Sequence, residues 1–279
     1  MPSKAVLITG CSSGIGHATA EQLMSRGWKV YATARRPESI ADLEAKGCQT
    51  LALDVTDEPS MSAAVSSVTE AEGAVGVLIN NAGYSQSGAV ESVAIDEVRR
   101  QFETNVFGPL RMCQLVLPGM REQRWGKIVN LGSMGGKLTF PGGGVYHATK
   151  YAVEAISDAL RFEVRGFGVD VILIEPGLIV TNFGEAATST VPGASGGPYA
   201  SFNEKVGKLT TEAYKGPMSK LGGPPEAVAK RIADALEAKR PKARYPVTAS
   251  AHLMINQRRL TPDRVWDLIM RSQFPTPKP

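Results

Sequence analysis

The chain has 279 residues, of which 43% are hydrophobic and 21% are charged, an ordinary balance for a globular protein with a core of normal size. The formal net charge is +4 and no basic block accompanies it, which argues against a nucleic-acid-binding protein. No apolar run approaches the about 20 residues that a membrane span requires, and the first residues lack the parts of a secretory signal. We therefore expect a cytoplasmic protein without a membrane span.

The cysteines and histidines do not indicate a metal site or a disulfide framework. Cys11, Cys48 and Cys113 are far apart and odd in number, so reduced, mostly buried thiols are expected. Neither His17 nor His147 has a second ligand at a useful spacing along the sequence.

Short apolar runs alternate with longer helical patterns along the first two thirds of the chain. Strands are expected at residues 4–9, 28–34, 50–53, 75–80, 127–131 and 169–174, and the first helix at 14–26. Strands that are apolar on both sides suit a sheet covered by helices on both faces. Alternating strands and helices predict an α/β protein with a Rossmann fold, built on a doubly wound parallel sheet.

Two later regions break this pattern. Residues 182–223 are rich in Gly, Ser, Thr and Ala with weak helical patches such as 202–208, and a segment of this kind is usually functional or disordered. We interpret 1–279 as one domain, with a cofactor-binding and catalytic core over 1–181, a substrate lid over 182–223, and a C-terminal helix, last strand and tail over 224–279. The tail either extends a subunit interface or covers the pocket, and the sequence leaves both open.

Three glycines crowd the passage from the first strand to the first helix. The run is Thr9-Gly10-Cys11-Ser12-Ser13-Gly14-Ile15-Gly16. Glycine permits a positive φ and a close backbone approach to a ligand, and the N-terminus of the following helix suits a pyrophosphate. This context, after a strand and opening a helix, predicts a dinucleotide site.

The end of the second strand favours NADP(H) over NAD(H). An acidic residue there would bind a free ribose 2′-hydroxyl, but the strand ends in Arg35 and Arg36, and guanidinium suits a 2′-phosphate. The Ser12 hydroxyl can add to such a site. Arg36 can equally be a solvated charge before Pro37.

Tyr146 and Lys150 are four residues apart and share one face of a helix. Ser133 lies thirteen residues earlier, and the glycine-rich chain between them can loop back. A neighbouring ammonium favours the charged form of a phenol, so we expect the pKa of Tyr146 to fall from about 10 toward the working pH of an acid/base.

These features together resemble the classical short-chain dehydrogenase/reductase family. The resemblance covers about residues 4–181 and is carried by the glycine turn and by Asn80-Asn81-Ala82-Gly83, Asn105, Ser133, Tyr146-His147-Ala148-Thr149-Lys150 and Pro176-Gly177. It implies a sheet of about seven strands, hydride transfer between a nicotinamide and an alcohol or ketone, and no metal in the chemistry. Within the family, the chain is most similar to the 17β-hydroxysteroid and retinol dehydrogenase branch.

The resemblance also implies roles for single residues. Tyr146 is implied as acid/base, Lys150 as the residue that binds the nicotinamide ribose and lowers the pKa of the tyrosine, Ser133 as the substrate-orienting residue, and Asn105 as the holder of a relay water. The implied cofactor-binding set is Gly10, Ser12, Ser13, Gly14, Ile15, Gly16, Arg35, Arg36, Asp54, Val55, Asn81, Ala82, Gly83, Tyr146, Lys150, Pro176, Gly177, Ile179 and Thr181.

One of these roles has a physical argument. Pro109 follows Asn105 by four residues and has no N–H, so the Asn105 carbonyl loses its helical partner and is free for water. The apolar repeat of Val98, Phe102, Leu110, Cys113 and Leu117 should face the core.

The substrate pocket should lie at the carboxyl ends of the strands. Expected lining residues are Ser133, Leu138, Phe140, Val145, Tyr146 and Leu178. Their apolar character suggests a steroid-, retinoid- or aromatic-ketone-like substrate. Polar residues in 182–223 keep a polyfunctional substrate open, and Lys137 argues against a purely apolar pocket.

Two other function classes remain open: a regulator that senses NADP(H) without turnover, and an epimerase or dehydratase that uses the cofactor transiently. The family resemblance also implies a homodimer or homotetramer through the helices that contain Asn105 and Tyr146. We expect a small alcohol or ketone as partner and no nucleic acid.

Overall fold

A computed structural model describes residues 1–181, 183–192 and 197–277. The predicted lid boundary Asn182 and the last two residues of the predicted tail lie outside the described residues. The strands are β1 (Val6–Ile8), β2 (Val30–Ala34), β3 (Gln49–Ala52), β4 (Val77–Asn80), β5 (Gly126–Leu131), β6 (Val169–Pro176) and β7 (Arg244–Val247). The α-helices are α1 (Gly14–Ser25), α2 (Ala41–Ala45), α3 (Glu58–Glu72), α4 (Ile95–Phe102), α5 (Gly108–Glu122), α6 (Gly144–Glu163), α7 (Phe183–Ser189), α8 (Ala200–Lys215), α9 (Pro225–Glu237), α10 (Ala249–Leu260) and α11 (Asp263–Gln273).

The strands form one parallel sheet in the order β3-β2-β1-β4-β5-β6-β7. This confirms the predicted doubly wound fold of about seven strands. The order reverses between β1 and β4, and in open α/β sheets ligands bind outside the carboxyl ends of the strands at such a switch point. The inner strands β1, β2, β4 and β5 are buried along their whole length, as two-sided coverage requires.

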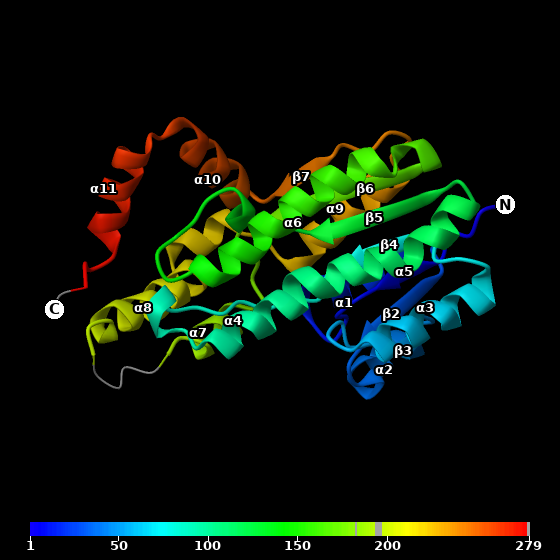
Figure 1. The fold of residues 1–279 in the computed structure, drawn as a ribbon, viewed down its shortest axis with the longest axis horizontal. Helices are drawn as coiled ribbons and strands as arrows, with labels where there is room; N and C mark the ends of the chain where they lie inside the picture. Colours follow the sequence, from blue (N-terminus) through cyan, green and yellow to red (C-terminus); the bar gives the residue numbers. More distant parts are fainter. Residues whose placement is uncertain (182, 193–196, 278–279) are drawn as a thin grey trace.

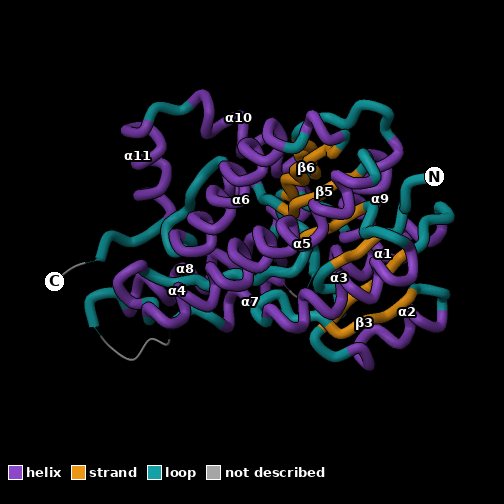
Figure 2. Tube along the Cα trace, turned by 45° about the vertical axis from the view of Figure 1, so that its right-hand side comes forward, coloured by secondary structure: helices purple, strands orange, loops and turns teal. Residues whose placement is uncertain are grey.

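Helices cover both faces of the sheet (Figures 1 and 2). On one face, α1, α2 and α9 enclose a core that includes Leu23, Leu43 and Ile232. On the other, α3 and α5 enclose a second core that includes Val68 and Met112. Side chains on the two faces of the strands contribute to both cores. The two helix layers thus fix the positions of the strand ends, where the glycine turn and the other sequence motifs lie.

The helix that carries Asn105 contains a π-helical turn, η3 (Glu103–Phe107), between α4 and α5. There the Gly108 N–H donates to the Glu103 carbonyl, five residues back. This turn lies directly before Pro109, the residue that cannot donate, and π-turns are frequent at functional sites.

The predicted core face of this helix is confirmed only in part. Cys113 is buried and the half-buried Leu117 packs against the second core, whereas Val98, Phe102 and Leu110 are half-buried outside that cluster. The buried residues are instead Gln101, Asn105, Val106, Gly108, Met112, Cys113, Val116 and Met120. The π-turn inserts an extra residue and shifts the phase of the helix, which an uninterrupted 3.6-residue period does not anticipate.

Residues after β6 form more helix than the sequence indicates. The weak patch at 202–208 is the middle of α8, and the tail folds into β7, α10 and α11. Figure 1 shows α7, α8, α10 and α11 gathered at one end of the sheet. None of the described helices is long and apolar enough to cross a membrane.

Candidate active site

The glycine turn between β1 and α1 has the backbone shape that a phosphate cradle needs. Gly10 and Gly14 have φ of +73° and +61°, in the region that favours glycine. A Cβ on Gly16 would lie 2.3 Å from the Gly10 carbonyl oxygen, so the turn closes only without a side chain there. α1 has neither a side-chain cap nor an acidic residue in its first turn. Its N–H groups are therefore available to an anion.

Hydrogen bonds tie this turn to the end of β4. The Thr9 hydroxyl accepts from the backbone N–H groups of Asn81 and Ala82, both at 3.0 Å. The Asn81 amide donates to the carbonyls of Thr9 and Gly10, both at 2.9 Å. Asn81 thus positions the glycine turn from the neighbouring strand, a structural contact in addition to the cofactor contact that the sequence predicts.

A cavity of about 1310 Å³ runs along the carboxyl ends of the strands. Most of the predicted cofactor-binding residues line it: Gly10, Ser12, Ser13, Gly14, Ile15, Arg35, Asp54, Val55, Asn81, Ala82, Gly83, Tyr146, Lys150, Pro176, Gly177, Ile179 and Thr181. Gly16 does not line it, since it packs against Gly10 behind the turn. Arg35 is exposed at the cavity wall, whereas Arg36 is exposed and outside it. An open glycine cradle at the switch point of the sheet fits a dinucleotide.

Ser133, Tyr146 and Lys150 meet in the wall of this cavity. Ser133 follows β5, and its hydroxyl accepts from the Gly135 N–H at 3.0 Å. Tyr146 and Lys150 lie one turn apart on α6. The buried Lys150 ammonium donates to the Leu131 carbonyl at 2.6 Å and lies 5.8 Å from the centre of the Tyr146 ring. The sheet and α6 together thus hold the three side chains at one point.

The expected fall in the pKa of Tyr146 is not found in this structure. Burial raises the pKa of the phenol to about 12, and the nearby Ser133 hydroxyl only partly opposes the rise. Burial also lowers the pKa of Lys150 to about 8, which Glu154 opposes. Desolvation, which the spacing of residues along the sequence does not reveal, dominates for groups this deeply placed. Tyr146 is therefore protonated at neutral pH.

Asn105 stands behind these residues and does not line the cavity. Its side-chain amide donates to the Tyr84 carbonyl at 2.9 Å and to the Thr149 hydroxyl at 3.1 Å, and its oxygen accepts from the Tyr84 N–H at 3.1 Å. The side chain therefore links the π-turn, the loop after β4 and α6.

The part of the cavity next to α8, α10 and α11 is built largely from residues that the sequence did not single out. Apolar side chains from α8, α10, α11 and the segments beside them line it: Phe183, Val206, Leu209, Met218, Leu221, Leu253, Met254, Trp266, Ile269, Met270 and Phe274. The C-terminal tail thus lines the pocket, one of the two roles left open for it. These residues belong to no recognisable sequence motif. Their apolar spacing predicts a buried helix face, but it does not predict whether that face lines a cavity.

The predicted lining residues divide into two groups. Ser133, Phe140, Tyr146 and Leu178 line the cavity. Leu138 and Val145 do not: Leu138 is fully buried against Trp266 and Met270, and Val145 is buried in the first turn of α6. Lys137 also stays out of the cavity, because its ammonium forms an ion pair with the buried Glu154. Lys137 therefore does not argue against an apolar pocket.

The fold brings together one group that the sequence reading passed over. His17, Glu21 and Asp42 place ligand atoms within 4.8 Å of one another. Lys46 forms ion pairs with both carboxylates of this group, so one of its two negative charges is already neutralised. The three cysteines are buried and unpaired.

Comparisons with known proteins agree with this geometry. A model of the short chain dehydrogenase family matches residues 4–192. The NADPH-dependent 3-dehydrocapnine reductase of Ornithobacterium rhinotracheale is 38% identical over 274 residues, which cover 94% of each chain. The 3-ketodihydrosphingosine reductase of Bacteroides thetaiotaomicron is 44% identical over 184 residues, which cover 66% of each. A solved short-chain dehydrogenase from Streptomyces avermitilis has a TM-score of 0.80 and 35% identity, with 97% of this chain and 98% of that chain covered. The chain belongs to the short-chain dehydrogenase family of oxidoreductases.

Proposed function

We propose that this protein is an NADP(H)-dependent oxidoreductase that interconverts a ketone and a secondary alcohol on an apolar substrate. The observation that carries the proposal is the meeting of Ser133, Tyr146 and Lys150 in the wall of the cavity that the glycine turn opens into. The cofactor, when bound, supplies or accepts the hydride.

Tyr146 acts as the general acid in reduction. Because burial holds its pKa at about 12, the phenol carries the proton that a developing alkoxide needs. The Ser133 hydroxyl, held by the Gly135 N–H, is placed to bind the substrate oxygen. Lys150 is fixed in the wall of the cavity by the Leu131 carbonyl. Its role as a ligand of the nicotinamide ribose belongs to the proposal, as does the relay role of Asn105.

Arg35 selects NADP(H). It is the cation at the cavity wall at the end of β2, where a guanidinium pairs with a 2′-phosphate. The printed name of the reductase from Ornithobacterium rhinotracheale supports the same preference. Arg36 lies outside the wall, so it contributes at most a long-range electrostatic attraction to the 2′-phosphate.

The substrate is apolar and large. The lining by α8, α10 and α11 offers aliphatic and aromatic side chains, and the names of two relatives refer to a dehydrocapnine and a ketodihydrosphingosine. We infer a long-chain or ring ketone, and we take 182–223 as the lid over it. The outer faces of the helices of Asn105 and Tyr146 carry exposed Phe107, Tyr151 and Phe162, which supports assembly into a homo-oligomer there.

The test is NADPH oxidation, followed optically, across long-chain ketones, steroid ketones and aromatic ketones, with Tyr146→Phe as control. We expect turnover with at least one apolar ketone and its loss in the variant. Tight NADPH binding with no turnover on the panel would instead favour a sensor of the cofactor.

A further inference from the structure

A second hollow of about 460 Å³ lies between α8 and α11. Gln273 and Phe274 line both this hollow and the large cavity, so the two spaces adjoin. The Phe274 ring packs against Phe202, with ring centres 6.1 Å apart. The hollow therefore lies against the apolar part of the large cavity, with Gln273 and Phe274 in the wall that the two spaces share.

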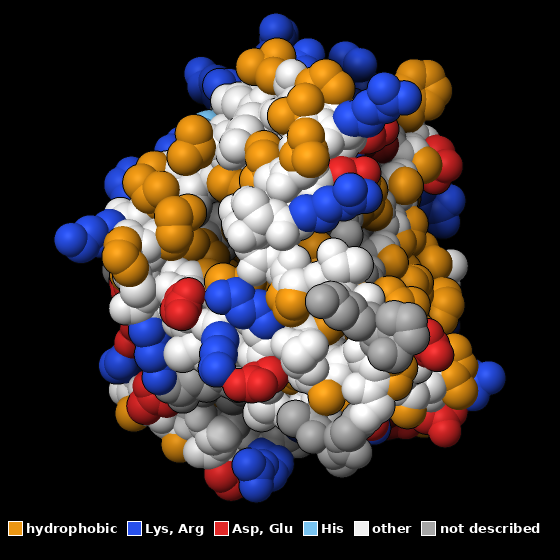
Figure 3. Space-filling view, turned by 90° about the vertical axis from the view of Figure 1, so that its left-hand side faces the viewer, with side chains coloured by type: hydrophobic (Ala, Val, Ile, Leu, Met, Phe, Trp, Pro, Cys, Tyr) orange, Lys and Arg blue, Asp and Glu red, His pale blue; other side chains and the backbone are white. Residues whose placement is uncertain are grey.

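The rim of this hollow is cationic. It carries Lys205, Lys208 and Arg271 but only one carboxylate, that of Glu204. Glu204 forms an ion pair with Lys208 at 2.6 Å. Figure 3 shows apolar and cationic side chains next to each other on this end of the molecule.

Lys205 differs from the other sheltered cations of the chain. It is half-buried, and no hydrogen bond or ion pair is found for its ammonium among the described residues. Every other buried or half-buried lysine or arginine in the described ranges has a carboxylate or carbonyl partner, a group made up of Arg26, Arg111, Lys127, Lys137, Lys150, Arg244 and Arg258. An anion that enters the hollow would therefore meet no competing carboxylate at Lys205 among the described residues.

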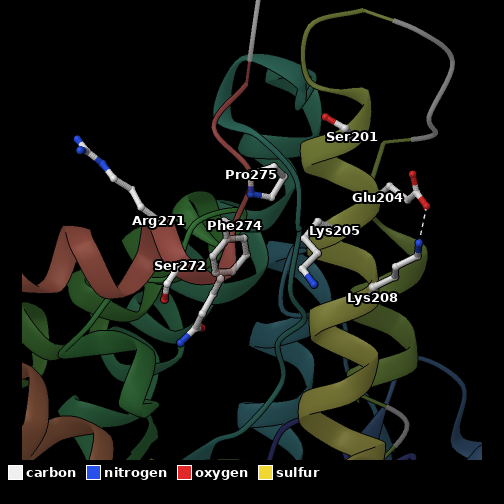
Figure 4. Close-up of a pocket in the computed structure, with 9 residues that line it drawn as sticks. Ser201, Glu204, Lys205, Lys208, Arg271, Ser272, Phe274 and Pro275 are labelled. Carbon is white, nitrogen blue, oxygen red and sulfur yellow. Dashed lines mark ion pairs between the residues drawn. The ribbon is translucent and has the colours of Figure 1, made fainter.

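The direction of the side chain identifies where that anion would lie. Figure 4 shows Lys205 on the side of α8 that is nearer α11, whereas Lys208 lies on the other side of the helix and pairs with Glu204. Lys205 thus faces the hollow that adjoins the apolar cavity. A ligand that places an acidic group there has its apolar part in the space that leads to Tyr146.

We propose that this hollow is a subsite for an acidic head group, with Lys205 as its counter-ion, and that the substrate is an amphiphilic ketone with an anionic end. The inference rests on the proposed function for the ketone, but the binding of the anion can be tested without turnover. The chemistry that Lys205 recognises is shared by sulfonate, phosphate and carboxylate groups.

The binding test compares decane-1-sulfonate with decan-1-ol, which share an apolar chain and differ in the charge of the head group. Calorimetry with the full chain should show the sulfonate binding more tightly. Lys205→Ala should remove the preference, about a 10-fold loss for one charge-assisted contact. Lys205→Arg should keep most of it, and added salt should weaken it. Lys242→Ala removes an exposed lysine outside both cavities and should change nothing.

Equal binding of sulfonate and alcohol by the unaltered protein, or an unchanged preference in Lys205→Ala, would overturn the subsite. The matching kinetic experiment uses long-chain oxo-acids and their methyl esters. Lys205→Ala should raise KM for the acid alone and leave kcat unchanged. Absence of turnover with both, together with a Lys205-dependent preference for sulfonate, would contradict the ketone reductase and leave the subsite standing.

Discussion

The two parts of the cavity are held together by different kinds of interaction. The cofactor end, from the glycine turn to α6, is fixed by close backbone packing and by hydrogen bonds such as those of Thr9 and Asn81. The substrate end, from α8 to α11, is lined by apolar side chains that pack in small clusters around Phe202 and Trp266. A site held by geometry tolerates few substitutions, whereas apolar packing accommodates many side chains. The predictions below are ordered by the size of the effect that this contrast implies.

The largest effect is expected at Tyr146. Tyr146→Phe removes the proton donor while the ring can keep its packing beside Phe183, so turnover should fall by about 10²–10⁴-fold, the range for a general acid. NADPH binding should persist, as measured by fluorescence titration. A variant that keeps more than a tenth of the rate would show that another group supplies the proton.

The next effect concerns the backbone of the glycine turn. Gly16→Ala places a Cβ 2.3 Å from the Gly10 carbonyl oxygen, whereas Gly27→Ala, at φ +80°, meets no atom within 4 Å. The control should cost about 1–2 kcal/mol of left-handed strain, and Gly16→Ala should cost more and abolish NADPH binding. Urea unfolding and cofactor titration measure both. Similar losses in the two variants would mean that the turn is less closely packed than described.

A smaller, selective effect is expected at the end of β2. Arg35→Ala should raise KM for NADPH by about 10-fold or more, because a charge-assisted contact with the 2′-phosphate is lost, and should leave KM for NADH unchanged. Arg36→Ala should change KM for NADPH far less. Equal effects of the two substitutions on KM for NADPH would contradict binding of the 2′-phosphate by Arg35.

The substrate end should respond more gently. Leu253 is 52% exposed and lines the cavity, whereas Leu268 on α11 is 63% exposed and does not line it. Leu253→Ala should raise KM for a large apolar ketone several-fold, since about 0.8 kcal/mol is lost per buried methylene, with little change in melting temperature. Leu268→Ala serves as the matched control. Steady-state kinetics with a large and a small ketone would show whether α10 contacts the substrate.

The smallest effect on turnover is expected for Glu175, which influences stability against pH instead. Glu175 on β6 is buried beside Glu154, with Lys137 and Arg244 also facing it, and burial followed by repulsion from Glu154 raises its pKa to about 7. A pKa raised in the folded state means that stability is lost as pH rises from the unfolded value toward 7. Glu175→Gln removes this ionisation. The free energy of unfolding of the variant, relative to that of the unaltered protein, should therefore increase between pH 5 and 7. Above pH 7 the difference between the two proteins should change little. A constant difference across that range would mean that Glu175 is ionised throughout.

The sequence predicts the cofactor half well because each residue type there has a local physical reason. A glycine triplet after a buried strand and a tyrosine one turn from a lysine can be recognised without tertiary structure. The strands of the doubly wound sheet follow from apolar runs in the same way. Each of the six predicted strands differs from the structure by one or two residues at one or both ends, within the usual uncertainty of element ends.

Three features could not be predicted, each for a tertiary reason. The π-turn at Asn105 shifts the buried face of its helix by a residue. From the sequence, Pro109 predicts only that the helical hydrogen bonds are interrupted nearby, not that a π-turn forms. The pKa of Tyr146 depends on burial, which spacing does not reveal. The contribution of α10 and α11 to the cavity depends on where the tail packs, and residues such as Trp266 and Phe274 are equally suited to an ordinary core.

The most direct test of the central claim is to follow the hydride itself. NADPH deuterated at the transferring position of the nicotinamide would be incubated with an apolar ketone that the protein turns over, and the alcohol analysed by mass spectrometry. We expect one deuterium on the carbinol carbon, formed by the unaltered protein and not by Tyr146→Phe. An alcohol without deuterium, or equal incorporation with both proteins, would contradict a Tyr146-assisted hydride transfer.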